Sequence, residues 1–212
     1  GGGTPSLLAA AELDVLFSAI HKNYKVSTMP EITVEANPDD LTPEKLRELK
    51  PFGVNRLSIG IQSFDEAVLR FLNRAHTANE AVECVELARN AGIENISIDL
   101  IYSIPGQPEE VLKKNLDKAF ALHPTHISAY SLTVEEKTVF GKWAKQGKLV
   151  AMDDDKSTAQ FELVMDSLTR QGYQHYEISN YCLPGYESKH NTSYWQQKKY
   201  LGVGPSAHSF DG

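Results

Sequence analysis

The chain opens with residues suited to holding a small polar ligand: three glycines, Gly1, Gly2 and Gly3, followed by Thr4 and Pro5. Residues without a Cβ leave backbone N–H groups open, while threonine and proline are favoured where a helix begins. A helix N-terminus also carries partial positive charge. The stretch predicts a cradle for a carboxylate, a phosphate or the polar end of a zwitterion, although terminal glycine runs are also typical of linkers. Its spacing fits neither the dinucleotide nor the P-loop motif.

Polar residues also stand near the ends of apolar, β-branched segments. Glu35 and Asp99 lie late in two such segments, and Gln62 comes just after another. A buried carboxylate is costly without a partner, so each acidic residue predicts an ammonium, a pair of ribose hydroxyls, backbone amides or a nearby arginine. Arg74 could offer a bidentate fork to a carboxylate or be a solvated surface residue.

These residues recur at equivalent places in an alternating series of strands and helices. We expect strands at 31–36, 56–61, 95–101 and 126–132, with helices at 7–21, 42–49, 77–92, 112–120 and 153–171. Such alternation indicates a parallel sheet covered by helices, in which ligands bind outside the carboxyl ends of the strands. We predict a last strand at 173–179 and an irregular loop region from residue 185 onward.

Composition narrows the class of protein. With 212 residues, 41% hydrophobic and 23% charged, the chain is typical of one large globular domain. Its net charge of −7 argues against nonspecific nucleic-acid binding, and no apolar run reaches the length of a membrane span. The two cysteines, Cys84 and Cys182, are far apart and predict neither a disulfide framework nor a metal site, so a cytoplasmic location is expected.

Five motifs in order now give the chain a family resemblance. They are GGGTPS at 1–6, EANP at 35–38, RLSIGIQSF at 56–64, NRAH at 73–76 and DLIYSIPG at 99–106. The chain resembles a radical S-adenosylmethionine (SAM) protein of the oxygen-independent coproporphyrinogen oxidase family. That resemblance implies an α/β fold, a partial (β/α)6 TIM-like barrel with the start of a C-terminal extension. Residues 1–172 would form the barrel, without its first strand, and 173–212 would lead to a further domain.

The resemblance also implies a cofactor site. The residues expected to hold SAM are Gly2, Gly3, Thr4, Glu35, Gln62, Arg74 and Asp99. In the family, the glycines and threonine meet the methionyl amino group, the glutamine and arginine address the methionyl carboxylate, and the acidic residues hold other polar groups. The family's C-x-x-x-C-x-x-C motif, whose thiolates bind a 4Fe–4S cluster, lies before the glycine run. The cluster ligands are therefore expected upstream of this chain.

The second half is similar to the HemW branch of that family, the haem chaperones. The resemblance rests on YEISNY at 176–181, HNTSYW at 190–195 and YLGVGPSAH at 200–208. In that branch the H-N-x-x-Y-W motif is associated with haem binding, so His190 is the candidate axial ligand and Cys182 a weaker one. We expect this position to lie apart from the strand-end SAM site.

The function implied is that of a haem chaperone, which binds haem and passes it to haem-receiving proteins. Its cofactors would be SAM and a 4Fe–4S cluster. One alternative is an oxygen-independent coproporphyrinogen III oxidase, which decarboxylates propionate side chains by a 5′-deoxyadenosyl radical. Another is a (β/α) ligand-binding or structural domain that has lost the cofactor.

Overall fold

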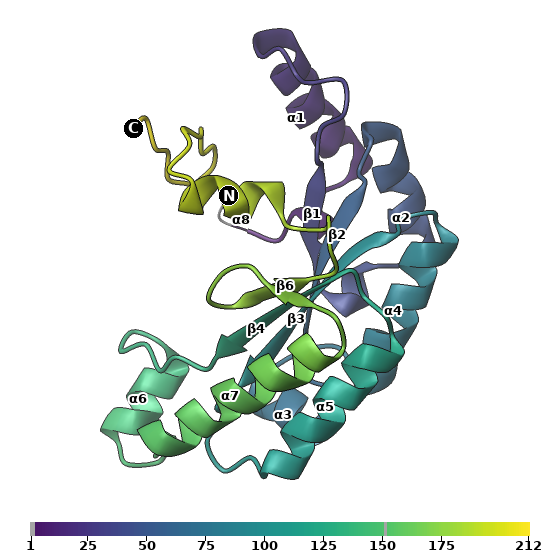
Figure 1. The fold of residues 1–212 in the computed structure, drawn as a ribbon. Helices are drawn as coiled ribbons and strands as arrows, with labels where there is room; N and C mark the ends of the chain where they lie inside the picture. Colours follow the sequence, from purple (N-terminus) through teal and green to yellow (C-terminus); the bar gives the residue numbers. More distant parts are fainter. Residues whose placement is uncertain (1–2, 151) are drawn as a thin grey trace.

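A computed structural model describes residues 3–150 and 152–212. Within these residues the chain folds around a six-stranded sheet with the order β1-β2-β3-β4-β6-β5 (Figure 1). Four strands, β1 (Thr33–Ala36), β2 (Arg56–Gln62), β3 (Asn95–Tyr102) and β4 (His126–Ser131), are parallel. This confirms the alternating α/β pattern and the parallel sheet predicted from the sequence. In the described part of the chain the sheet stays open, as a partial barrel would.

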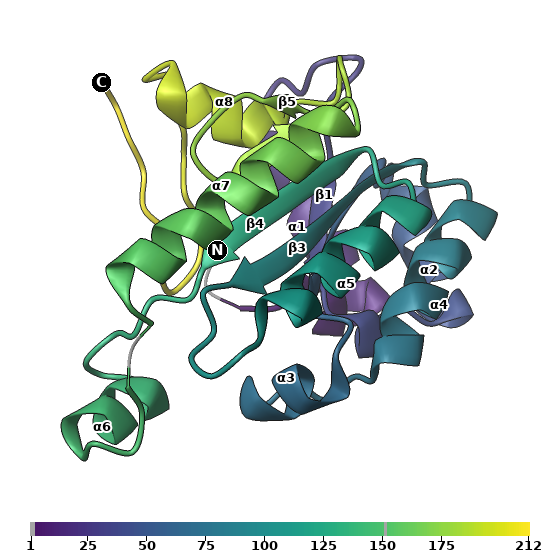
Figure 2. The ribbon, with the colours of Figure 1, turned by 60° about the horizontal axis from the view of Figure 1, so that its bottom comes forward.

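Helices cover one face of the parallel strands. They are α2 (Pro43–Leu49), α4 (Ala78–Asn90) and α5 (Glu109–Ala121), and Figures 1 and 2 show them on the same side of the sheet. Strand residues that point toward them are fully buried, among them Leu57, Ile59, Ile98 and Ile127. Removal of this apolar surface from water is the main source of stability for the arrangement.

The helix boundaries follow from capping residues. Thr42 accepts a hydrogen bond from the Lys45 backbone N–H (3.2 Å), and Pro43 occupies the first turn. Thr77 accepts one from the Glu80 N–H (3.2 Å), and the Glu80 carboxylate accepts from the Thr77 N–H (2.7 Å). These contacts satisfy backbone groups that the helix itself leaves without partners.

The remaining elements are shorter or lie at the ends of the sheet. They are η1 (Pro5–Leu7), α1 (Ala10–Asn23), η2 (Pro38–Asp40), η3 (Lys50–Phe52), α3 (Glu66–Phe71), α6 (Val139–Lys145), α7 (Asp154–Arg170), β5 (Gln174–His175), β6 (Asn180–Cys182) and α8 (Lys189–Trp195).

The N-terminal cradle differs from the sequence prediction. The glycine run does not lead directly into the long helix, because a 3-10 turn at Pro5–Leu7 comes first and α1 begins only at Ala10. Thr4 stands at the cap position but makes no side-chain capping bond. The run therefore ends on one tight turn, which Ser6 fixes by donating to Asp40 Oδ2 (2.8 Å).

Two predictions for the last forty residues are wrong. The single strand expected at 173–179 is an antiparallel pair, in which β5 pairs with β6 and β6 pairs with β4. The chain turns between them because Glu177 accepts hydrogen bonds from the Ser179 backbone and the Asn180 side chain. The tail is also not wholly irregular, since Ser188 caps α8 by accepting from the Asn191 N–H (3.3 Å).

Candidate ligand-binding site

The face of the sheet away from α2, α4 and α5 is polar. Alternate residues of the four parallel strands point to it, since side chains alternate between the faces of a strand. They include Arg56 and Ser58 on β2, Asp99 on β3, and His126 and Ser128 on β4. Strand pairing places Asp99 beside Ser128. Helix α8 and the C-terminal tail lie on this side (Figure 1).

A cavity of about 780 Å³ lies against this face, within the size range of small-molecule sites. It is lined by strand residues, by the N-terminal segment and by the tail: Gly3, Thr4, Pro5, Leu8, Leu16, Glu31, Thr33, Glu35, Arg56, Ser58, Asp99, Ser128, Tyr130, Ser188, His190, Asn191, Val203, Gly204 and Pro205. Segments far apart in the sequence thus meet around one space.

Most of the predicted site residues line this cavity. Gly3, Thr4, Glu35, Asp99 and His190 all do so, although they come from four different parts of the chain. A side chain added at Gly3 would meet open space, so packing within the described chain does not require a glycine there. The prediction for the residue before it, Gly2, lies outside the described residues.

Asp99 is the acidic group with the most altered chemistry. Burial raises the pKa of its carboxyl to about 6, and the negative charge of Glu35 adds to the rise. Ser128 and Arg56 act in the opposite direction, and Ser58 Oγ lies 3.4 Å from Asp99 Oδ1. A carboxyl group that titrates near neutral pH can accept hydrogen bonds when ionised and donate one when protonated.

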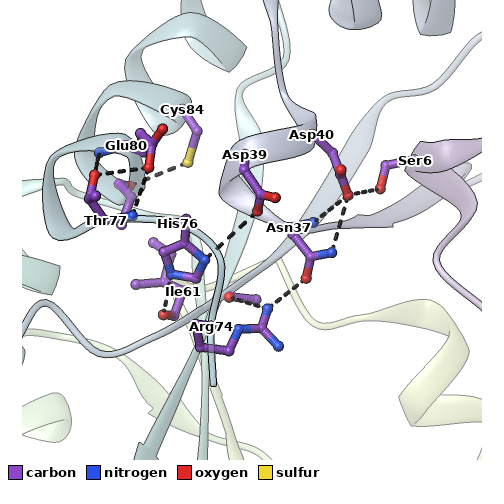
Figure 3. Close-up of polar contacts among 12 residues, drawn as sticks. Ser6, Asn37, Asp39, Asp40, Ile61, Arg74, His76, Thr77, Glu80 and Cys84 are labelled. Atoms are coloured by element: carbon purple, nitrogen blue, oxygen red, sulfur yellow. Dashed lines mark hydrogen bonds and ion pairs between the residues drawn. The ribbon is translucent and has the colours of Figure 1, made fainter. Parts of the chain in front are cut away.

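Gln62 and Arg74 lie beside each other but outside the cavity lining. Arg74 Nη2 donates to Asn37 Oδ1 (2.6 Å) and to the Gly60 carbonyl (3.1 Å), as Figure 3 shows for the first of these contacts. A Cβ at Gly60 would lie 2.9 Å from Gln62 Nε2 and 3.3 Å from Arg74 Nη2. The glycine therefore lets both side chains approach the strand end closely.

The backbone of Gln62 is itself unusual. Its φ of 65° falls in the left-handed region, where a residue with a side chain is uncommon, and the β2–β3 register shifts between Ile59 and Gln62. Strain of this kind gathers at ligand-binding positions. It occurs here at the carboxyl end of β2, where ligands bind to parallel sheets.

Sequence reasoning missed a buried polar group at the other end of the strands. Ser97 Oγ lies 2.7 Å from His126 Nδ1, and His126 Nε2 lies 2.8 Å from the Tyr176 hydroxyl. Burial, with the charge of Arg56 as a smaller cause, lowers the pKa of His126 to about 3, so its ring is neutral. The signal was the alternation of polar residues in 126–131, which an average over the apolar segment conceals.

His190 belongs to an aromatic cluster on α8 and the tail. Its Nε2 lies 2.6 Å from the Tyr194 hydroxyl, and its ring meets those of Tyr194 and Tyr200 edge-on. Helix α8 contains no buried residue, and its first N–H, from Lys189, donates to both oxygens of Glu31 (3.2 Å each). The expectation that this histidine lies apart from the strand-end site is wrong, since it shares the cavity with Glu35 and Asp99.

The cysteines offer no cluster site. Cys84 on α4 and Cys182 on β6 are both free and buried, and burial raises the pKa of their thiols to about 12 and about 11. No group of three or more potential metal ligands exists among the described residues. The residues of 3–150 and 152–212 therefore do not fit a 4Fe–4S cluster by themselves. No helix in the same ranges is long and apolar enough to cross a membrane.

Comparison with known proteins defines the class. The model of the radical SAM superfamily matches residues 1–119, more than half of the chain, so the chain belongs to that superfamily. Coproporphyrinogen III oxidase (HemN) of Escherichia coli, a radical SAM enzyme, has a similar structure, with a TM-score of 0.82 and 26% identity over 99% of this chain and 51% of that one. Radical SAM proteins use SAM and a 4Fe–4S cluster.

Curated relatives bear the more particular name heme chaperone HemW. That of Lactococcus lactis is 43% identical over 99% of this chain and 55% of its own length. Those of Bacillus subtilis and Escherichia coli are 42% and 39% identical, over 100% and 98% of this chain. The predicted resemblance to the haem chaperones is confirmed. The chain spans about half the length of these relatives.

Proposed function

We propose that the protein is a haem chaperone of the radical SAM superfamily, which binds haem and passes it to recipient proteins. The observation that carries this proposal is the single cavity shared by Glu35, Asp99 and His190. The relatives named heme chaperone HemW, similar over the whole of this chain, support it. Its free, buried cysteines suit the reducing cytoplasm, where we place it.

The lining of the cavity divides the proposed contacts. Gly3 and Thr4, with Gly2 before them, would receive the amino group of SAM, while Glu35 and Asp99 hold its other polar groups. Gln62 and Arg74 would bind the methionyl carboxylate at the end of β2. Arg74 retains donors for this beyond its contacts with Asn37 and Gly60, because a guanidinium carries five N–H groups. Bound SAM and cluster would supply radical chemistry.

His190 is the proposed axial ligand of the haem iron. Neutral imidazole is the usual protein ligand to haem iron. Its neighbours Tyr194 and Trp195 are 43% and 58% exposed and offer apolar surface to a macrocycle. A ligand on a short exposed helix suits a carrier, which has to release its cargo as well as hold it.

The His190→Ala variant of the full-length protein tests this function. It is expected to shift the Soret band and to weaken haem binding and transfer to an acceptor such as apomyoglobin. His21→Ala, on exposed α1, is the matched control. If His190→Ala binds and transfers haem like the parent, the assignment of the ligand is wrong and Cys182 becomes the next candidate.

A coproporphyrinogen III oxidase is the second candidate, favoured by the structural similarity to HemN. It would bind a tetrapyrrole with propionate side chains in the same cavity and decarboxylate them. Incubation of the full-length protein with coproporphyrinogen III, SAM and a reductant distinguishes the two functions. Decarboxylated product, measured by mass spectrometry, would support the oxidase over the chaperone.

A further inference from the structure

The cavity contains a buried cation that the proposed contacts do not use. Arg56, the first residue of β2, is 4% exposed and lines the cavity. Its Nε is buried without a hydrogen-bond partner, and none of the ion pairs between described residues includes it. A charge in such a place is costly unless an anion pairs with it.

The carboxylates nearby are occupied elsewhere or too far away to pair with it. Glu31 accepts from the first N–H of α8, and Asp99 lies beside Ser58 and Ser128. The positive charge of Arg56 is nevertheless felt in the cavity, since it contributes to lowering the pKa values of Asp99 and His126. The guanidinium is thus held in place by the strand and left without a counter-ion.

Its position separates it from the SAM end of the cavity. Arg56 and Gln62 are the two ends of β2, roughly 20 Å apart for an extended strand. Helix α8 begins at the Arg56 end: the Lys189 N–H meets Glu31, and the Arg56 N–H donates to the carbonyl of Ile32, the next residue along (3.2 Å). Since His190 follows Lys189, the proposed iron ligand and the unpaired arginine belong to the same end.

We propose that Arg56 binds a propionate carboxylate of the haem whose iron His190 ligates. This rests on the proposed function and extends it by naming a recognition element for the porphyrin edge. A guanidinium presents two parallel N–H donors to a carboxylate, a geometry that selects a free acid over its ester.

The test is a binding cycle with the full-length protein, with haem and haem dimethyl ester as probes. The wild type is expected to bind haem more tightly than the ester by roughly ten- to a hundredfold, the value of a hydrogen bond to a charged group. Arg56→Met is expected to lose that difference, binding both alike. Arg56→Lys, which keeps the charge without the fork, should restore part of it. Arg47→Met removes an exposed arginine as the control.

Melting temperature separates ligand binding from a structural role. Because the buried charge lacks a partner, the ligand-free Arg56→Met protein is expected to melt no lower than the wild type. A lower melting temperature, or equal loss of haem and ester affinity, would overturn the inference. So would loss of SAM affinity with haem affinity unchanged, which would assign the carboxylate to methionine. If the wild type binds neither haem nor its ester, the proposed function fails with it.

Discussion

The two faces of the β1–β4 sheet are built by the same strands and carry opposite kinds of side chain. Toward the helices, Ile59, Ile98 and Ile127 are fully buried. Toward α8, their immediate neighbours Ser58, Asp99 and Ser128 line a cavity. A parallel sheet is usually apolar on both faces. The difference teaches that one face maintains the fold, whereas the other is free to bind a ligand.

The largest expected effect comes from damage to the apolar face. Ile98→Ala removes buried atoms between β3 and the helices and is expected to lower the free energy of unfolding by about 2–5 kcal/mol. Urea unfolding followed by circular dichroism measures it. Ser58→Ala, on the polar face of the neighbouring strand, should have a much smaller effect, and equal losses from the two variants would contradict the comparison.

The polar face should instead respond in ligand binding. In the full-length protein, Glu35→Gln and Asp99→Asn are each expected to weaken SAM binding by roughly ten- to a hundredfold, because each loses a charged hydrogen-bond acceptor worth about 1.5–3 kcal/mol. Isothermal titration calorimetry measures the affinities, with the exposed Glu44→Gln as control. Unchanged affinity in both variants, with the fold intact, would refute these site assignments.

A smaller effect should appear in the pH dependence of stability. Because the folded protein raises the pKa of Asp99 from an ordinary value near 4 to about 6, the folded state binds the proton more tightly than the unfolded state. The resulting stabilisation is complete below about pH 4 and is lost as the pH rises through 6. Asp99→Asn should remove this fall from the stability profile. A profile identical to that of the wild type would show that the carboxyl titrates normally.

The sequence supports the first two-thirds of the fold better than the last third. In the first part, capping residues and apolar strands reinforce each other: Thr42 and Thr77 begin helices where they were expected. Beyond residue 172 the elements are short, and pairing with β4 rather than local pattern decides them. The Ser188 cap was the one local signal for α8, and the aromatic residues around it suggested a loop.

The site divides along a similar line. Glu35 and Asp99 could be found because acidic residues in apolar strands are conspicuous. Arg56 could not, since it stands at a strand boundary and only the structure shows that it is buried without a partner. The meeting of His190 with the strand residues depends on how the tail folds back, which no local pattern contains.

The attachment of α8 determines how the cavity can exchange its contents. The helix has no buried residue and is fastened mainly at its first turn, where Lys189 meets Glu31 and the Ser188 N–H meets the Tyr176 hydroxyl (3.4 Å). Breaking so few contacts requires far less free energy than unfolding the sheet. The helix can therefore swing about its N-terminal end as a hinged door does, on the microsecond-to-millisecond timescale of collective motions. Cargo can enter and leave while the apolar face stays intact.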